Sequence, residues 1–191
     1  MSSEAITIVS GLPRSGTSMM MRMLEAGGIP SLVDNIRIAD EDNPRGYYEF
    51  ERVKQVKEDK GWLDDARGKV VKMVSALVRD LPTEGYRYRI VFMRRNMNEI
   101  LASQKQMLVR SGKPTDAIAD DKMAALFERH LQQVEAWLAK QPSVAVLYVH
   151  YNELLASPAE HIARVNHFLG GALDAAAMMA VVDKALYRQR K

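Results

Sequence analysis

The sequence contains no cysteine, which excludes disulfides, thiolate metal sites and a cysteine nucleophile. Its charge is nearly balanced, with 27 basic against 24 acidic residues and a net charge of +3, so charge alone does not favour nucleic acid as a partner. No hydrophobic run approaches the length of a transmembrane helix, about 18 residues. The first residues, MSSEAITIVS, lack the basic and apolar parts of a signal peptide. These absences predict a cytoplasmic protein that spans no membrane and binds no nucleic acid.

Four short apolar runs, rich in β-branched residues, are present at residues 6–9, 70–74, 88–93 and 144–149. Nearly continuous hydrophobicity over such short lengths is typical of strands buried on both faces of a parallel sheet. Segments with helical periodicity lie between these runs, including a long one over residues 123–138. The alternation predicts a three-layer α/β fold of the P-loop type, with a central parallel sheet of four to five strands flanked by helices. At 191 residues, the chain is expected to form one such domain over residues 1–191.

Several predicted helices have recognisable ends. The first follows residue 18 and ends at the glycine pair of residues 27–28. Residues 96–99 resemble a capping box, in which Asn96 caps a helix and Glu99 reaches back to the start of it. A later helix begins at Pro158 and ends at Gly170. His130, His161 and His167 lie on predicted helices without partners at metal-ligand spacing, so we expect no metal site from them.

The loop between the first predicted strand and helix, GLPRSGTS at residues 11–18, is bounded by glycines. A strand, a glycine-bounded loop and a helix together turn backbone N–H groups and a helix N-terminus toward an anion. The glycine spacing is that of a phosphate-binding P-loop, but Thr17 stands where a kinase or NTPase carries lysine. The basic residue lies inside the loop instead, at Arg14. The sequence therefore predicts an anion site whose cation is an arginine of the loop.

Two further motifs follow the loop. RNMNEILAS, residues 95–103, joins a strand end to a helix, and VLYVHYNELLASP, residues 146–158, joins the last predicted strand to the next helix. In this order and spacing, PRSGTS at residues 13–18 and these two motifs resemble those of the sulfotransferases, and the chain resembles a compact bacterial type. That family moves a sulfonate group from 3'-phosphoadenosine 5'-phosphosulfate (PAPS) to an acceptor. The resemblance extends over about residues 5–170.

The resemblance implies a set of donor-binding residues. It implies that the 5'-phosphosulfate is held by Arg14, Ser15, Gly16, Thr17 and Ser18, the 3'-phosphate by Arg95 and Ser103, and the adenine by Tyr151. Physical chemistry agrees, because PAPS carries anionic groups on both sides of its ribose and an arginine fork suits phosphate oxygens. The structural alternatives are a surface arginine, a solvated helix serine and a core tyrosine at a strand end. The Arg-Lys-Gly loop that helps to bind the 3'-phosphate in cytosolic members is not recognisable in this chain.

Sulfonate transfer is expected to resemble phosphoryl transfer, an in-line displacement that needs cations near the bridging oxygen and a base on the acceptor. Arg14 is the first predicted cation and Lys72 the second. Lys72 lies within the apolar run KVVKMV, where a buried lysine is costly unless it is paired or functional. It resembles the family's strand lysine, which precedes a catalytic histidine by two residues, but Val74 occupies that histidine position. The alternative is a lysine at a sheet edge whose ammonium group reaches solvent.

With the histidine missing, we predict Glu49 as the general base. It ends the stretch GYYE at residues 46–49, which looks like a glycine–aromatic–x–glutamate stretch of several bacterial relatives. The alternative is that Glu49 is one of many solvated carboxylates in a charged segment.

The charged segments at residues 34–67 and 110–121 are candidate lids, or else solvated surface excursions. The aromatic residues Tyr47, Tyr48, Phe50 and Trp62 are candidates for the wall of a pocket that takes a small-molecule or glycan acceptor. The acceptor itself and the oligomeric state stay open.

Two other functions are compatible with the motifs. One is a small-molecule or nucleotide kinase of the P-loop type, which needs Mg²⁺ held in part by an acidic residue at a strand end. None of the predicted strands ends in aspartate, and the loop lysine is absent, so we favour a metal-independent sulfonate transfer. The other is a non-catalytic protein that binds PAPS or 3',5'-ADP.

Overall fold

The computed structural model describes residues 5–34, 36, 48–112, 114–115 and 118–182. Four parallel strands form one sheet in the order β2-β1-β3-β4. The strands are β1 (Ile6–Gly11), β2 (Val70–Lys72), β3 (Tyr88–Arg94) and β4 (Val144–His150). All four lie within one residue or two of the predicted runs. This result confirms the predicted α/β fold with a parallel sheet of four strands.

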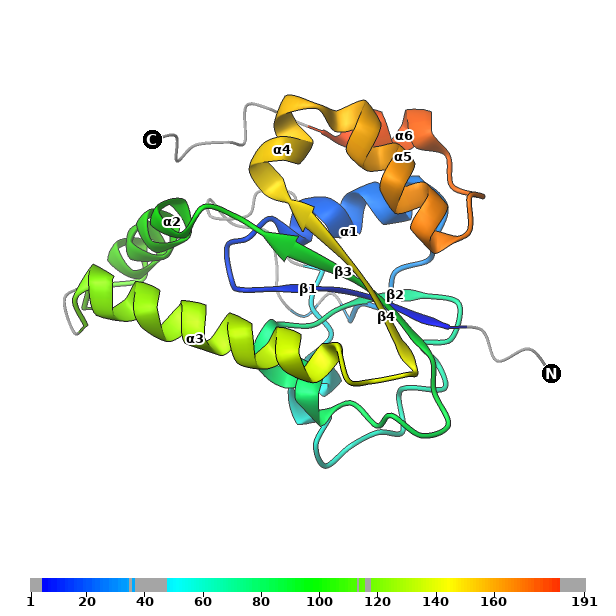
Figure 1. Ribbon diagram of the computed structural model, residues 1–191, viewed down its shortest axis with the longest axis horizontal. Helices are drawn as coiled ribbons and strands as arrows, with labels where there is room; N and C mark the ends of the chain where they lie inside the picture. The colour runs from blue at the N-terminus through cyan, green and yellow to red at the C-terminus, as the bar shows by residue number, and fades with distance from the viewer. Residues whose placement is uncertain (1–4, 35, 37–47, 113, 116–117, 183–191) are drawn as a thin grey trace.

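Helices cover both faces of the sheet, as Figure 1 shows. One face packs against α1 (Thr17–Ala26), α4 (Tyr151–Ala156), α5 (Pro158–Leu169) and α6 (Ala175–Val181). The other face packs against α3 (Asp120–Leu138) and two short 3₁₀ helices, η1 (Glu51–Gln55) and η2 (Ser75–Asp80). The side chains of β1 alternate between the two cores, with Ile8 in one and Val9 in the other, because successive side chains of a strand point to opposite faces. The remaining helix, α2 (Met97–Arg110), directly follows the β3 end.

The structure corrects the prediction that residues 34–67 form a lid. Val53, Val56, Leu63 and Ala66 are all buried in the core on the α3 face of the sheet. The part of this segment from residue 50 onward is therefore core rather than lid. Its apolar residues escaped notice because lysines, aspartates and glutamates separate them, and a 3₁₀ helix has no long hydrophobic period. Residues 37–47 and 113, 116 and 117 of the two candidate lids lie outside the described residues.

Trp62 is also wrong as a candidate for the acceptor pocket. Its side chain is fully buried, its ring lies edge-on to Phe50 at 5.8 Å between centroids, and its Nε1–H donates to the Asp59 carbonyl at 3.1 Å. A tryptophan in such a position stabilises the core and has no surface left for a substrate. Tyr47, another of these candidates, lies outside the described residues.

Candidate active site

The carboxyl end of each strand supplies one predicted site residue or motif. Because the sheet is parallel, these four ends lie along one edge of it. In the spatial order of the strands they are Lys72 at the end of β2, the loop of residues 11–18 after β1, Arg95 after β3, and Tyr151 after β4. Residues separated by up to 140 positions in the sequence, from Gly11 to Tyr151, are thus brought into one row.

The loop of residues 11–18 has the shape of an anion-binding turn. Arg14 and Gly16 both adopt left-handed backbone conformations, with φ of 71° and 97°. The Ser15 hydroxyl donates to the Leu12 carbonyl at 2.7 Å, which closes the turn. Helix α1 then begins at Thr17, so the N–H groups of Thr17 and Ser18 lie at the helix start beside the loop, and those of Met19 and Met20 donate to the Gly16 carbonyl at 3.1 and 3.2 Å. This arrangement of N–H groups at a helix start suits a phosphate or sulfate group.

Tyr151 packs directly on this loop. A Cβ atom added to Gly16 would lie 2.3 Å from Cδ2 of the Tyr151 ring, so only glycine fits at residue 16. The Arg95 guanidinium lies over the same ring, 4.8 Å from the ring centroid. Tyr151 therefore packs against both the loop and Arg95, and it is buried.

Arg95 and Ser103 are both bound to the loop. The Arg95 Nη1–H donates to the Arg14 carbonyl at 3.0 Å, and the Arg14 Nε–H donates to the Ser103 hydroxyl oxygen at 2.9 Å. Ser103 lies on α2, 89 residues from Arg14 in the sequence. The preceding arginine, Arg94, is directed elsewhere and pairs with Glu135 of α3. The structure thus brings the predicted 5'-phosphosulfate loop into direct contact with Arg95 and Ser103, the residues predicted to bind the 3'-phosphate.

Sequence reasoning missed the partner of Arg95. The Arg95 Nε–H donates to the Glu99 carboxylate at 2.9 Å, and the two side chains are only 9% and 3% exposed. The other Glu99 oxygen accepts from the Asn152 amide at 2.9 Å. A buried ion pair with further hydrogen bonds holds the arginine in one orientation. The signal that would have found this pair is the four-residue spacing between an arginine just before a helix and a glutamate in the first turn of that helix.

The capping box is correct in one half only. The Asn96 side chain accepts from the N–H groups of Asn98 and Glu99, as predicted for an N-cap. However, the Asn96 N–H donates to the Asn152 side chain at 3.4 Å, and Glu99 instead serves Arg95 and Asn152. The Glu99 carboxylate, which would complete a capping box by binding the Asn96 N–H, therefore binds Arg95 and Asn152 instead.

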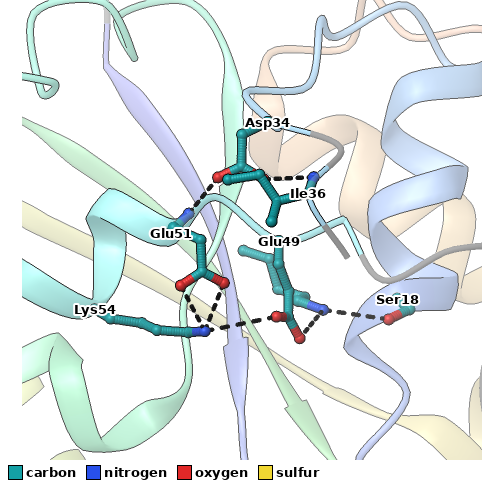
Figure 2. A network of polar contacts seen from close by, with 7 residues as sticks. Ser18, Asp34, Ile36, Glu49, Glu51 and Lys54 are labelled. Carbon is teal, nitrogen blue, oxygen red and sulfur yellow. Dashed lines mark hydrogen bonds and ion pairs between the residues drawn. The ribbon is translucent and has the colours of Figure 1, made fainter. Parts of the chain in front are cut away.

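Lys72 and Glu49, which the sequence predicts as site residues on independent grounds, lie next to each other. The Lys72 Nζ is 3.8 Å from Oε1 of Glu49 and 3.5 Å from the Ser18 hydroxyl, and the lysine and glutamate side chains are 11% and 19% exposed. In Figure 2, Glu49 lies between Ser18 and Lys54, whose Nζ is 3.9 Å from the other Glu49 oxygen. Lys72 is therefore paired and faces the loop, which removes the alternative of a lysine directed to solvent.

Lys54 is held by a second glutamate. Its Nζ binds both carboxylate oxygens of Glu51 at 2.6 and 2.8 Å. Asp34 in turn accepts from the Glu51 N–H at 2.6 Å, as Figure 2 shows. The chain directly after Glu49 is thus fixed at Glu51 by contacts with both Lys54 and Asp34.

The position of the absent family histidine is exposed and apolar, since Val74 is 40% exposed. The next residue, Ser75, is buried, and its hydroxyl is 2.9 Å from Nε2 of His130 on α3. Burial, together with the charge of Arg79, lowers the pKa of His130. This hydrogen bond joins η2 to α3, and we interpret it as structural.

Tyr48 is hydrogen-bonded to a glutamate in the C-terminal part of α1. Its hydroxyl donates to the Glu25 carboxylate at 2.7 Å. Burial and this hydrogen bond raise the pKa of Tyr48 to about 12, so the phenol is neutral at physiological pH.

Comparisons with known proteins agree with this geometry. The family model described as a sulfotransferase domain matches residues 5–191. The chain belongs to the sulfotransferase domain family, which confirms the resemblance of its motifs. Comparison with curated protein sequences gives no significant match.

Solved structures share the fold. The mouse sulfotransferase SULT7A1, crystallised with PAP, matches with a TM-score of 0.59 and 17% identity over 94% of this chain and 62% of its own. This chain thus spans less than two thirds of the mouse protein. The sulfotransferase STF1 of Mycobacterium tuberculosis H37Rv matches with a TM-score of 0.57 and 17% identity over 97% of this chain and 74% of its own. A sulfotransferase of Alicyclobacillus acidocaldarius matches with a TM-score of 0.50 and 15% identity over 97% and 99%.

Two kinds of feature are absent from the described part of the chain. No helix there is both long and apolar enough to cross a bilayer. Nor does any group of three or more histidine, aspartate or glutamate side chains there come together in a way that would hold a metal ion.

Proposed function

We propose that this protein binds PAPS and transfers its sulfonate group to a hydroxyl or amine of an acceptor. The proposal rests on the row of site residues at the carboxyl edge of the sheet, where two anion-binding sets of residues lie side by side. One is the loop of residues 11–18, and the other is formed by Arg95 and Ser103. A donor with anionic groups on both sides of a ribose fits two such sockets, and the Tyr151 ring, which packs against both Gly16 and Arg95, is the proposed contact for the adenine.

Each strand end then has a role in the proposed reaction. The loop N–H groups with Ser15, Gly16, Thr17 and Ser18 hold the phosphosulfate, and Lys72 beside Ser18 neutralises charge that builds on the oxygens of the transferred group. The acceptor oxygen attacks sulfur, the bond from sulfur to the bridging phosphate oxygen breaks, and 3',5'-ADP leaves. Glu49 takes the proton of the acceptor, because its carboxylate lies on the same side of the loop as Lys72.

The acceptor is proposed only by class, as a small molecule or glycan with a hydroxyl or amine group. Of the four aromatic candidates for its pocket, Trp62 is excluded by burial, and Phe50 packs against it. Tyr48 is half-buried, and its ring packs on the core on the α1 side.

The test is turnover of labelled PAPS with a panel of phenol, sugar and amine acceptors, in the presence of EDTA. We expect label to move to at least one acceptor with release of one 3',5'-ADP for each product, because no step of the proposed reaction needs a metal ion. Transfer of phosphate from ATP that requires Mg²⁺, with no use of PAPS, would show a kinase. Tight binding of 3',5'-ADP with no turnover across the panel would favour the non-catalytic binder.

A further inference from the structure

We infer that Tyr48 is a positioning residue for Glu49, the proposed general base, and that it acts through its hydrogen bond to Glu25 on α1. The inference rests on the proposed function, because Tyr48 has this role only if Glu49 takes the proton of the acceptor. The Tyr48 hydroxyl donates to the Glu25 carboxylate at 2.7 Å. The chain after Glu49 is fixed through Glu51, as Figure 2 shows, so Tyr48 supplies the anchor before it.

The backbone conformation of Tyr48 is strained. Its φ is 53°, and Tyr48 is one of two non-glycine residues with positive φ in the described part of the chain. A bulky residue in this left-handed region is an outlier that persists where the surrounding contacts fix it, and such residues cluster at functional sites. The other one is Arg14, within the anion-binding loop. The chain therefore takes a strained turn directly before the proposed base.

The side chains of Tyr48 and Glu49 are held at opposite ends of α1. Tyr48 binds Glu25 in the last turn of this helix. Glu49 lies 3.8 Å from Lys72, which in turn lies 3.5 Å from the Ser18 hydroxyl in the first turn. Residues seven positions apart, such as 18 and 25, are separated by about 10 Å along a helix axis. A shift of Tyr48 along α1 would therefore move the Glu49 carboxylate relative to Lys72.

Glu25 joins two separate segments of the chain. One of its carboxylate oxygens accepts from Tyr48, and the other accepts from the Ser31 hydroxyl. Ser31 pairs with Val70 of β2, the strand that ends at Lys72. The same carboxylate therefore fixes the chain before the proposed base and the chain beside the strand that carries the lysine.

The contacts of Glu25 offset an unfavourable position in its own helix. It lies in the last turn of α1, where a negative charge opposes the helix dipole. Alanine at this position would have no charge and a higher helix propensity. The replacement Glu25→Ala therefore removes the contacts with Tyr48 and Ser31 without weakening α1 itself.

The experiment is a double-mutant cycle on kcat, measured on the full chain with labelled PAPS and two acceptors of the panel. Tyr48→Phe keeps the ring and loses the bond to Glu25, so we expect kcat to fall by about 5- to 10-fold with both acceptors. Glu25→Ala should lower kcat by a similar factor. The KM of each acceptor and the affinity for 3',5'-ADP should stay within about 3-fold of the wild type, because the base and not binding is affected.

The second arm of the cycle uses the Glu49→Gln background. There, Tyr48→Phe should change the remaining kcat by less than about 2-fold, because a residue that acts through the base has no effect once the base is absent. A merely structural role of Tyr48 would lower kcat by the same factor in both backgrounds.

Tyr88→Phe is the matched control. It also removes a tyrosine hydroxyl that is hydrogen-bonded, in this case to the Pro82 carbonyl at 2.8 Å. Tyr88 is buried and begins β3, so it lies at the amino end of the strand, away from the site. We expect Tyr88→Phe to lower Tm and to keep kcat within about 2-fold, since distant sites act independently.

The possible failures are distinguishable. Wild-type kcat in both Tyr48→Phe and Glu25→Ala, or equal losses in the two backgrounds, would overturn the inference and leave the proposed function intact. A rise in KM for one acceptor with kcat unchanged would also overturn it, because Tyr48 would then line the acceptor pocket. If the wild-type protein does not turn over PAPS, or if Glu49→Gln keeps the wild-type kcat, the proposed function or its general base fails together with the inference.

Discussion

Replacement of Lys72 by methionine is expected to lower kcat with PAPS by at least about 10²–10³-fold, the size seen when one preorganised donor to a developing negative charge is removed. The Lys72 ammonium lies 3.5 Å from the Ser18 hydroxyl at the start of α1, where the phosphosulfate is proposed to bind. Methionine keeps the apolar stem and removes the charge. Because 3',5'-ADP has no sulfonate group, its affinity should change by less than about 5-fold. The measurements are steady-state kinetics and calorimetric titration.

Lys54→Met is the matched control for Lys72→Met. Lys54 also lies 3.9 Å from Glu49, but its side chain is 59% exposed and Glu51 holds it away from the loop. If Lys72 acts on the transferred group, Lys54→Met should keep kcat within about 3-fold of the wild type. Equal losses in the two variants would mean that lysine at residue 72 only balances the charge of Glu49.

The second large effect is expected from Glu49→Gln, which should lower kcat by about 10²–10⁴-fold, the range for loss of a general base. Glutamine has the shape of glutamate but cannot accept the acceptor's proton. The affinity for 3',5'-ADP should persist, because Glu49 is proposed to contact the acceptor rather than the donor. Kinetics at saturating PAPS with the best acceptor of the panel provide the measurement.

Glu51→Gln controls for the charge of the segment. Glu51 binds Lys54, the lysine that also lies beside Glu49, at 2.6 Å, and its side chain is 41% exposed. We expect nearly full turnover from this variant. If Glu49→Gln kept the wild-type kcat, Glu49 would not be the general base, and its role would be that of counter-ion to Lys72.

Local patterns were sufficient to predict the sheet and the loop. Short apolar runs specify buried parallel strands, and glycines at residues 11 and 16 specify a turn before a helix, so neither needs information from distant residues. The motif residues Arg95, Ser103 and Tyr151 then fall at strand ends or on the next helix, where the topology brings them together. Lys72 and Glu49 were also predicted, although their mutual contact was not.

Contacts between segments that are far apart in the sequence could not be predicted from local patterns. The direction of Arg14 depends on a serine 89 residues later, and the pairing of Glu99 with Asn152 spans 53 residues. The segment after residue 50 was wrongly predicted to be a lid, because charged residues separate its apolar residues in the sequence. The burial of these apolar residues, including Trp62, is seen only in the packed core. The helices α4 and α6 were missed since each is short and has less than two full turns of pattern.

Thermal unfolding with matched nucleotides shows whether one site holds two anionic groups on the two sides of a ribose. A ligand at 100-fold its Kd stabilises a protein by about 2.7 kcal/mol, which corresponds to about 5–10 °C in Tm at this chain length. We predict a shift of this size with 3',5'-ADP and a clearly smaller one with AMP at the same concentration. A larger shift with ATP and Mg²⁺ than with 3',5'-ADP, or equal shifts with 3',5'-ADP and AMP, would mean that the site does not bind a 3'-phosphate together with a 5' anionic group.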